Sequence, residues 1–211
     1  MRDRLETLAR RFARLTTRAV VARPVLWRVF RFPLRKQFDA MASSWEGRRG
    51  PEALVPLGAA LERLERPPAR VLDLGTGTGK GARVVAKLFP DAEVVGVDLS
   101  GPMIEEARRL LPSELAGRVR FEVADGAALP FPDDSFDLVL LLNAIPFFDE
   151  LGRVSTRDGA AVFASSMGAE TPIYVPPETL RERLSPLGFV EFEDVDAGEG
   201  TALIARRGKT D

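Results

Sequence analysis

Two hydrophobic patterns alternate along most of the chain. Short apolar runs typical of buried strands occur at residues 70–74, 93–98, 119–124, 136–142 and 160–165. Before and between these runs, apolar residues recur at helical spacing over residues 51–66, 82–89 and 102–111, and again over 178–187. This alternation predicts an α/β fold with a doubly wound, mostly parallel sheet.

The last part of the chain changes this pattern. Residues 189–195 and 201–206 have the character of paired strands joined by a polar, glycine-containing turn at 196–200. A closing hairpin of this kind adds two strands and reverses one of them. We therefore expect a seven-stranded sheet with one antiparallel strand.

The first segment has a different character. Apolar residues at 3-4 spacing predict one face of a helix, with arginines on its other sides; they are Leu5, Leu8, Phe12, Leu15 and Ala19. Pro24 interrupts the pattern, and Pro33 is expected to end it. The sequence therefore predicts a helical extension over 1–37 and a second domain over 38–211.

The apolar face of the extension must be covered, because an isolated helix of this length is marginal in water. We expect it to pack on its own domain or on a second copy, as a lid over the ligand site. A homo-oligomer is thus left open. The alternative is a basic amphipathic surface that touches a membrane or an anionic partner.

The amino-acid composition excludes several kinds of site and chemistry. The 211 residues are 45% hydrophobic and 29% charged, as in an ordinary soluble protein, so we expect a cytoplasmic location. The chain has no cysteine and no histidine, which removes disulfides, thiolate metal sites, the commonest general base and the commonest zinc ligand. We therefore expect no metal. The net charge of −1 hides +9 in residues 1–37 and −10 in the rest.

A glycine-rich turn follows the first strand. Gly77 to Ala82 fits the dinucleotide pattern G-x-G-x-x-G/A, which is a weak signal alone. The phosphate-loop pattern fails, because Gly81 rather than Ser or Thr follows Lys80. Read from Asp73, the frame is acid-x-Gly-x-Gly-x-Gly, a strand-to-helix turn where a nucleotide-type ligand can approach the backbone.

In this frame the sequence VLDLGTGTG resembles the class I S-adenosylmethionine-dependent methyltransferases, in particular the small-molecule type with a methyltransferase type 11-like domain. Residues 38–46 are similar to that family's F-D-x-x-A-x-x-[YW]-[DE] segment, which lies over the methionine end of the cofactor. The resemblance covers about residues 38–206. It implies a Rossmann-like fold and S-adenosylmethionine as cofactor.

Asp98 stands at the tip of the second strand, 21 positions after Gly77, where a carboxylate can accept both ribose hydroxyls of an adenosine. The alternative for Asp98 is a surface residue that caps the next helix, although Ser100 is the better N-cap. The resemblance further implies that Asp125 accepts from the adenine amino group and that the amide of Gly126 or Ala127 reaches a ring nitrogen. The other cofactor residues it implies are Asp73, Gly75, Thr76, Gly77, Gly79, Leu99, Met103 and Asn143.

The acceptor end is less defined. The apolar run 145–148 and Trp45 favour a small hydrophobic acceptor, and the acidic body disfavours nucleic acid. We expect Trp45, Phe147 and Tyr174 to contact the acceptor, and Asp149, Glu150 or Tyr174 to take a proton if one must leave. Two alternatives stay open: a nicotinamide-dependent oxidoreductase, and a non-catalytic, membrane-associated nucleotide-binding protein.

Overall fold

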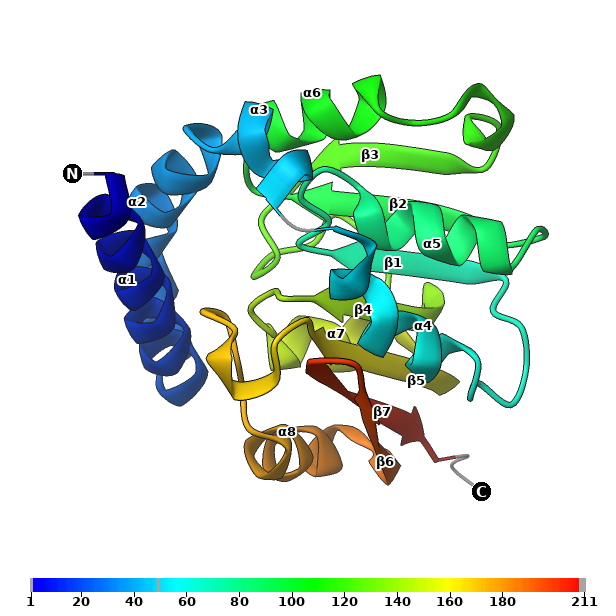
Figure 1. Ribbon diagram of the computed structural model, residues 1–211. Coiled ribbons are helices and arrows are strands. Elements are labelled where there is room, and N and C mark those ends of the chain that lie inside the picture. Colours follow the sequence, from blue (N-terminus) through cyan, green and yellow to red (C-terminus); the bar gives the residue numbers. More distant parts are fainter. Residues whose placement is uncertain (1, 49, 209–211) are drawn as a thin grey trace.

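The computed structural model describes residues 2–48 and 50–208, with side chains from residue 7 onward. A seven-stranded sheet forms its centre (Figure 1). The strand order is β3 (Val119–Val123), β2 (Glu93–Asp98), β1 (Arg70–Leu74), β4 (Phe136–Leu142), β5 (Ser155–Ser165), β7 (Gly200–Arg207), β6 (Phe189–Ala197). Strand β7 is antiparallel to both neighbours. The doubly wound sheet with one antiparallel strand is confirmed.

Helices cover both faces of the sheet. One core packs α4 (Val55–Leu61), α5 (Lys80–Leu88) and α6 (Gly101–Arg109) against β1, β2 and β4. The core on the other face contains side chains from α7 (Phe148–Val154) and α8 (Pro177–Leu184). Because both faces are covered, the central strands are apolar on both sides, as in β4.

Two elements differ in length from the expectation. Strand β5 begins at Ser155 rather than near residue 160, and its pairing with β4 shifts register between Phe136 and Leu138. The helix expected over 51–66 is divided into a 3-10 turn, Pro51–Leu54, and α4. A proline occupies the first turn of each piece, where its missing N–H costs nothing.

The N-terminal extension is a helical hairpin. Helix α1 (Arg2–Ala22) and helix α2 (Trp27–Asp39) lie side by side across the edge of the sheet toward which the arrowheads of β2 and β3 point (Figure 1). The ring centroids of Phe12 and Phe30 are 6.1 Å apart between the two helices. The short helix α3 (Ala42–Trp45) follows, and Trp45 lies beside the glycine loop.

Pro33 does not end α2, contrary to the sequence expectation, and the helix continues to Asp39. A proline inside a helix removes one backbone hydrogen bond. Buried Trp27 and Leu34, on either side of it, anchor both halves of α2. The helix thereby crosses the expected boundary after residue 37, and the division into two domains stays a prediction.

The buried face of α1 is also not the expected one. Leu8 and Leu15 are 59% and 60% exposed, while the face against the protein consists of Ala13, Thr16, Thr17 and Val20. Small side chains let α1 approach the domain closely, and the buried Thr17 hydroxyl donates to the Ala13 carbonyl within the helix. The side chain of Leu5 lies outside the described residues.

Candidate active site

A cavity of about 1000 Å³ lies between the carboxyl ends of β1, β2 and β4 and the N-terminal hairpin. Eleven of the residues expected at the site line it: Asp73, Gly75, Thr76, Gly77, Asp98, Leu99, Met103, Gly126, Asn143, Trp45 and Phe147. Gly79, Asp125 and Ala127 are not part of its wall. The structure thus brings together most of the positions that are scattered over 100 residues of sequence.

The glycine loop has the backbone that its sequence suggests. Gly75, Gly77 and Gly79 have φ angles of +73°, +54° and +81°, in the left-handed region that other residues rarely adopt. A Cβ on Gly75 would stand 2.6 Å from the Cβ of Ala144. Amides of Gly75 and Thr76 both donate to the Val97 carbonyl at 2.9 Å, which ties the loop to β2. Helix α5 starts directly behind the loop.

Asp73 supports this loop from inside. Its Oδ2 accepts from the Thr76 hydroxyl at 2.6 Å and from the Ala82 amide at 2.8 Å. Its Oδ1 is buried and has no hydrogen-bond partner among the described residues. Burial raises the pKa of Asp73 to about 6, against the two hydrogen bonds, which lower it. A ligand that brings a positive charge or a donor to Oδ1 would relieve this cost.

We expect Asp73 to make the protein less stable as the pH rises. The pKa of Asp73 in the folded protein lies above the ordinary value of 3.8. The stabilisation of the folded state by this carboxyl is therefore fully present below pH 3.8 and is lost as the pH rises through about 6. The shift of about two units corresponds to about 3 kcal/mol, of which about 1.4 kcal/mol falls between pH 5 and 8. Urea unfolding of the wild type and Asp73→Asn at both pH values measures it. Parallel pH dependence of the two proteins would contradict the assignment.

Asp98 lies at the tip of β2, as expected. Its Oδ2 accepts from the Gly77 amide and its Oδ1 from the Ser100 amide, both at 2.9 Å. Burial raises the pKa of Asp98, while these two bonds lower it. A carboxylate has about four acceptor positions, so Asp98 keeps capacity for ligand hydroxyls. The expected N-cap is confirmed, since the Ser100 hydroxyl accepts from the Met103 amide.

Replacing Asp98 by alanine is expected to weaken cofactor binding by about 1.5–3 kcal/mol, or about 10- to 150-fold, the range for hydrogen bonds to a charged group. Calorimetry with S-adenosylhomocysteine measures the affinity. Asp91→Ala, in the exposed turn before β2, is the control and should bind as the wild type does. Unchanged affinity in Asp98→Ala would show that Asp98 does not contact the ligand.

Asp125 is turned toward the hairpin. Its Oδ1 accepts from the Trp27 indole N–H at 2.7 Å, and its Oδ2 lies 3.4 Å from Arg31. The Ala127 amide also donates to Oδ1, at 3.0 Å. Adjacent Ala124 and Gly126 line the cavity, whereas Asp125 does not. Its role toward adenine stays a prediction.

The segment over residues 38–46 lies on the glycine loop. Carboxylate oxygens of Glu46 accept from Thr78 and Arg83, each at 2.7 Å, and its carbonyl accepts from Lys80 at 2.8 Å. The Ser100 hydroxyl donates to Asp39 at 2.6 Å. The chain that joins the hairpin to the domain is therefore fastened directly to the loop and to the helix after β2.

Asn143, at the tip of β4, has a strained backbone. Its φ is +54°, one of two positive values among the described non-glycine residues. The side-chain amide bridges to Ser166, with the Ser166 amide donating to Oδ1 at 2.9 Å. This bond holds the tip of β4 and the loop after β5 together where both line the cavity.

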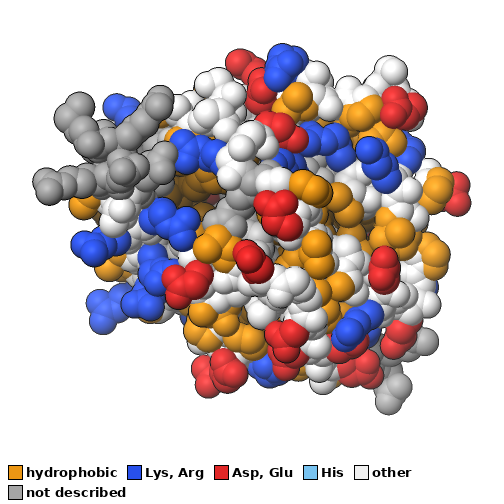
Figure 2. All heavy atoms as spheres, viewed as in Figure 1, with side chains coloured by type: hydrophobic (Ala, Val, Ile, Leu, Met, Phe, Trp, Pro, Cys, Tyr) orange, Lys and Arg blue, Asp and Glu red, His pale blue; other side chains and the backbone are white. Residues whose placement is uncertain are grey.

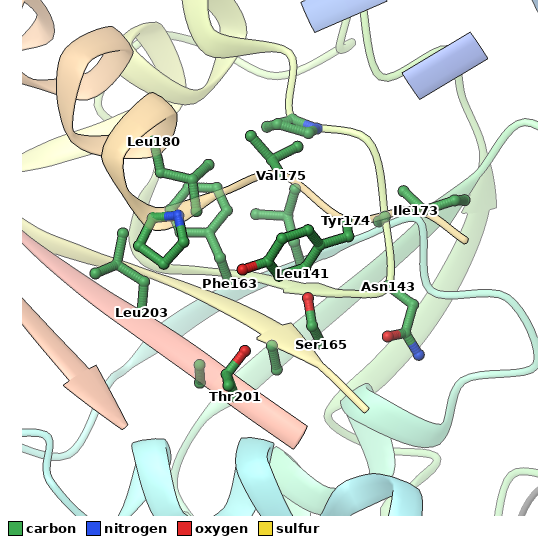
Figure 3. A pocket seen from close by; sticks show the side chains of 15 residues that line it. Leu141, Asn143, Phe163, Ser165, Ile173, Tyr174, Val175, Leu180, Thr201 and Leu203 are labelled. Carbon is green, nitrogen blue, oxygen red and sulfur yellow. The ribbon is translucent and has the colours of Figure 1, made fainter. Parts of the chain in front are cut away.

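The three expected proton acceptors lie elsewhere. Asp149 is exposed, and Arg153 holds the pKa of Glu150 below its usual range. Tyr174 lines a second cavity of about 30 Å³, with Phe163, Leu180 and Leu203, and burial raises its pKa (Figure 3). A volume of that size holds a water molecule rather than an acceptor. None of these three lines the large cavity, and their catalytic roles stay predictions without positional support.

Several residues of the cavity wall were not expected from the sequence. They come from the hairpin and from the loop after β5, and include Trp27, Arg35, Gln37, Thr171 and Ile173. For Trp27 the sequence provided a partial indication of burial, because it is an aromatic residue in the apolar pattern after Pro24. For the polar ones it provided none, because only the docking of the hairpin brings them to the site. Within the described residues, no group of three His, Cys, Asp or Glu side chains could hold a metal.

Comparison with known proteins agrees with this geometry. Residues 71–158 match the family described as a methyltransferase domain. The chain is 39% identical over 151 residues to malonyl-[acyl-carrier protein] O-methyltransferase from Halorhodospira halophila, covering 65% of this chain and 49% of that protein. It is 51% identical over 79 residues to demethylmenaquinone methyltransferase from Thermus thermophilus, covering 37% and 35%. The chain thus spans half or less of these relatives.

The fold is that of solved methyltransferases. A SAM-dependent methyltransferase from Aquifex aeolicus superposes with a TM-score of 0.63 at 18% identity, covering 79% of this chain and 98% of that one. The sheet, the glycine loop and the cavity define a nucleotide-binding α/β protein. The matched domain, the sequence relatives and the fold together support a class I S-adenosylmethionine-dependent methyltransferase, with S-adenosylmethionine as cofactor.

The residues present fit this cofactor. The left-handed glycines leave room for a ligand against the backbone, and the orphaned Oδ1 of Asp73 offers an acceptor to an ammonium group. Asp98 offers acceptors at the tip of β2, where the sequence predicts the ribose, and Met103 and Leu99 add apolar side chains to the cavity wall. The match supports a methyltransferase over the nicotinamide-dependent oxidoreductase considered from the sequence.

Proposed function

We propose that this chain transfers the methyl group of S-adenosylmethionine to a small hydrophobic acceptor. The observation that carries the proposal is the continuity of one cavity from the glycine loop to an apolar wall that includes Trp27, Leu34, Ile145 and Phe147. The volume of about 1000 Å³ is ample for a cofactor and a small second molecule. The names of the two relatives give malonyl-[acyl-carrier protein] and demethylmenaquinone as acceptors, and the second of these, a quinone, supports a small hydrophobic acceptor.

The cofactor, when bound, supplies a methyl group already activated on a sulfonium. The chain's own residues would mainly bind, orient and exclude water. The glycine-loop backbone and Asp73 would hold the methionine end, and Asp98 the ribose. Trp27 and Phe147, whose rings are 4.9 Å apart, would close the apolar side.

The described part of the cavity wall contains two acidic side chains that could remove a proton, and both are already engaged. The described acidic side chains that line it are Asp73 and Asp98, and both accept hydrogen bonds from backbone amides, Asp73 from Ala82 on α5 and Asp98 from Gly77 on the glycine loop. We therefore infer that the acceptor's reacting atom has a free lone pair or loses its proton to water. This favours an acceptor that ionises by itself, such as an acid or an enol.

The experiment is methyl transfer from labelled S-adenosylmethionine to a cell extract, followed by fractionation. We expect label in the organic-soluble small-molecule fraction and its loss in Asp98→Ala. Label in nucleic acid, or retention of residues 38–211 on DNA or RNA at physiological salt, would overturn the choice of acceptor. Cofactor binding without turnover would indicate the non-catalytic alternative.

A further inference from the structure

The N-terminal hairpin carries a row of apolar side chains that are each more than half exposed. Leu8 and Leu15 on α1 are 59% and 60% exposed; Val25, Val29 and Phe32, before and on α2, are 66%, 66% and 55% exposed. Helical spacing puts them opposite the buried faces of the two helices. We call these five side chains the outer face. They are five of the nine large apolar side chains exposed among the described residues.

Positive charge surrounds the outer face. Residues 7–38 contain nine basic and no acidic side chains. Arg35 and Lys36 flank the Phe32 ring at 4.8 Å and 5.7 Å from its centroid. Figure 2 shows Lys and Arg side chains gathered at the left, over the hairpin. Four exposed arginines form no ion pair within the described chain: Arg11, Arg18, Arg23 and Arg28.

Three other basic residues of the hairpin contact the domain. Arg10 and Arg14 donate to the carbonyls of Glu170 and Ala169, and Arg31 pairs with Asp125. These contacts fasten the inner side of the hairpin to the domain. The charges beside the outer face are therefore additional to those that hold the hairpin in place.

We propose that the outer face docks on an anionic lipid surface. Exposed apolar side chains interleaved with arginines match both the acyl boundary and the negative headgroups of such a surface. A second copy of the chain fits less well, because a two-fold contact would set like charges against each other. Nucleic acid fits less well too, because it offers no apolar partner to Val25, Val29 or Phe32. None of the described helices is long and apolar enough to cross a membrane, so the contact would be peripheral.

Docking would bring the site close to lipid. The inner side of the same hairpin supplies Trp27, Leu34 and Phe38 to the cavity wall. A hydrophobic acceptor dissolved in the bilayer would then have only the hairpin between it and the cavity. This step rests on the proposed function, whereas docking itself does not.

The test is flotation of the purified protein with vesicles, without cofactor. One set contains phosphatidylcholine with 25–30 mol% phosphatidylglycerol (about one anionic lipid in four), the other phosphatidylcholine alone. We expect binding to the anionic set that weakens as salt is raised. Val29→Asp should weaken it by about tenfold or more. Val190→Asp, the same change at a 63% exposed site on β6, should not.

The outcomes are distinct. No binding to anionic vesicles, or equal binding by Val29→Asp and Val190→Asp, would overturn the proposal. A dimer that Val29→Asp converts to a monomer would assign the outer face to a second copy instead, and retention on DNA abolished by Val29→Asp would assign it to nucleic acid. Calorimetry with S-adenosylhomocysteine checks that both variants are folded. Failure of methyl transfer would leave the flotation result unaffected.

Discussion

Gly77→Val is expected to abolish cofactor binding. Gly77 has a φ of +54° and lines the cavity, with its amide bonded to Asp98. A β-branched side chain is strained in this conformation, and a Cβ there would stand 3.4 Å from the Trp45 indole nitrogen, in the space between the loop and α3. The further methyl groups would occupy the ligand's volume. We expect affinity for S-adenosylhomocysteine to fall by more than about 100-fold, a cost of about 3 kcal/mol.

The control for this variant is Gly58→Ala. Gly58 lies on α4, where a Cβ would meet no atom within 4 Å. Its cofactor affinity should equal that of the wild type. Urea unfolding of both variants separates loss of the site from loss of the fold. If Gly77→Val is folded and binds the cofactor within a few-fold of the wild type, the ligand does not lie on this loop.

Removal of residues 1–33 is expected to lower turnover more than cofactor affinity. The deletion removes Trp27, and with it the cover over Phe147 and a donor to Asp125, but leaves Asp98 and the glycine loop intact. A site open to water and poorly shaped for the acceptor can lose about 100-fold in rate. Labelled-methyl turnover and calorimetry, on full-length and truncated protein, give the two quantities. Residues 1–37 would then act as the lid expected from the sequence.

The point variant Trp27→Ala guards against misfolding of the truncated protein. It removes the indole from the cavity while the hairpin keeps its other contacts, such as the Gln37 bond to the Ala9 carbonyl. We expect the same order of effects, with turnover falling more than affinity. Equal activity in the truncated and full-length proteins, with loss of vesicle binding only, would show that the hairpin is an anchor and that the lid is wrong.

Local patterns were sufficient for the sheet and the loop. Strand β2 and the run before Gly75 are apolar because parallel strands are buried on both faces, and that pattern is visible in sequence. The left-handed turn was visible because few residues other than glycine adopt it. The position of Asp98 followed from its place at the tip of the second strand, since neighbouring parallel strands end at the same edge of the sheet.

The packing of the N-terminal hairpin could not be predicted from local patterns in the same way. Its pattern suggested that Leu8 and Leu15 are buried. In the structure these two leucines are exposed, and Thr16 and Thr17 are buried instead. An apolar stripe indicates which helix face favours burial, but it does not indicate which surface of the protein is available to bury it. Here small side chains allowed close packing on the domain, and the leucines were left outside.

By itself, then, the sequence determined the class of fold and the glycine loop. It also determined the places of two carboxylates, Asp73 before the loop and Asp98 at the tip of the second strand, and the resemblance to the methyltransferases. These depend on a strand–turn–helix unit and on the shared edge of neighbouring parallel strands, where spacing fixes geometry. Only the tertiary structure decided that Trp27 meets Asp125, 98 residues away, and that Asp149 and Tyr174 lie outside the large cavity. Such pairings depend on how separate elements dock, which is a balance of packing surfaces that no local pattern encodes.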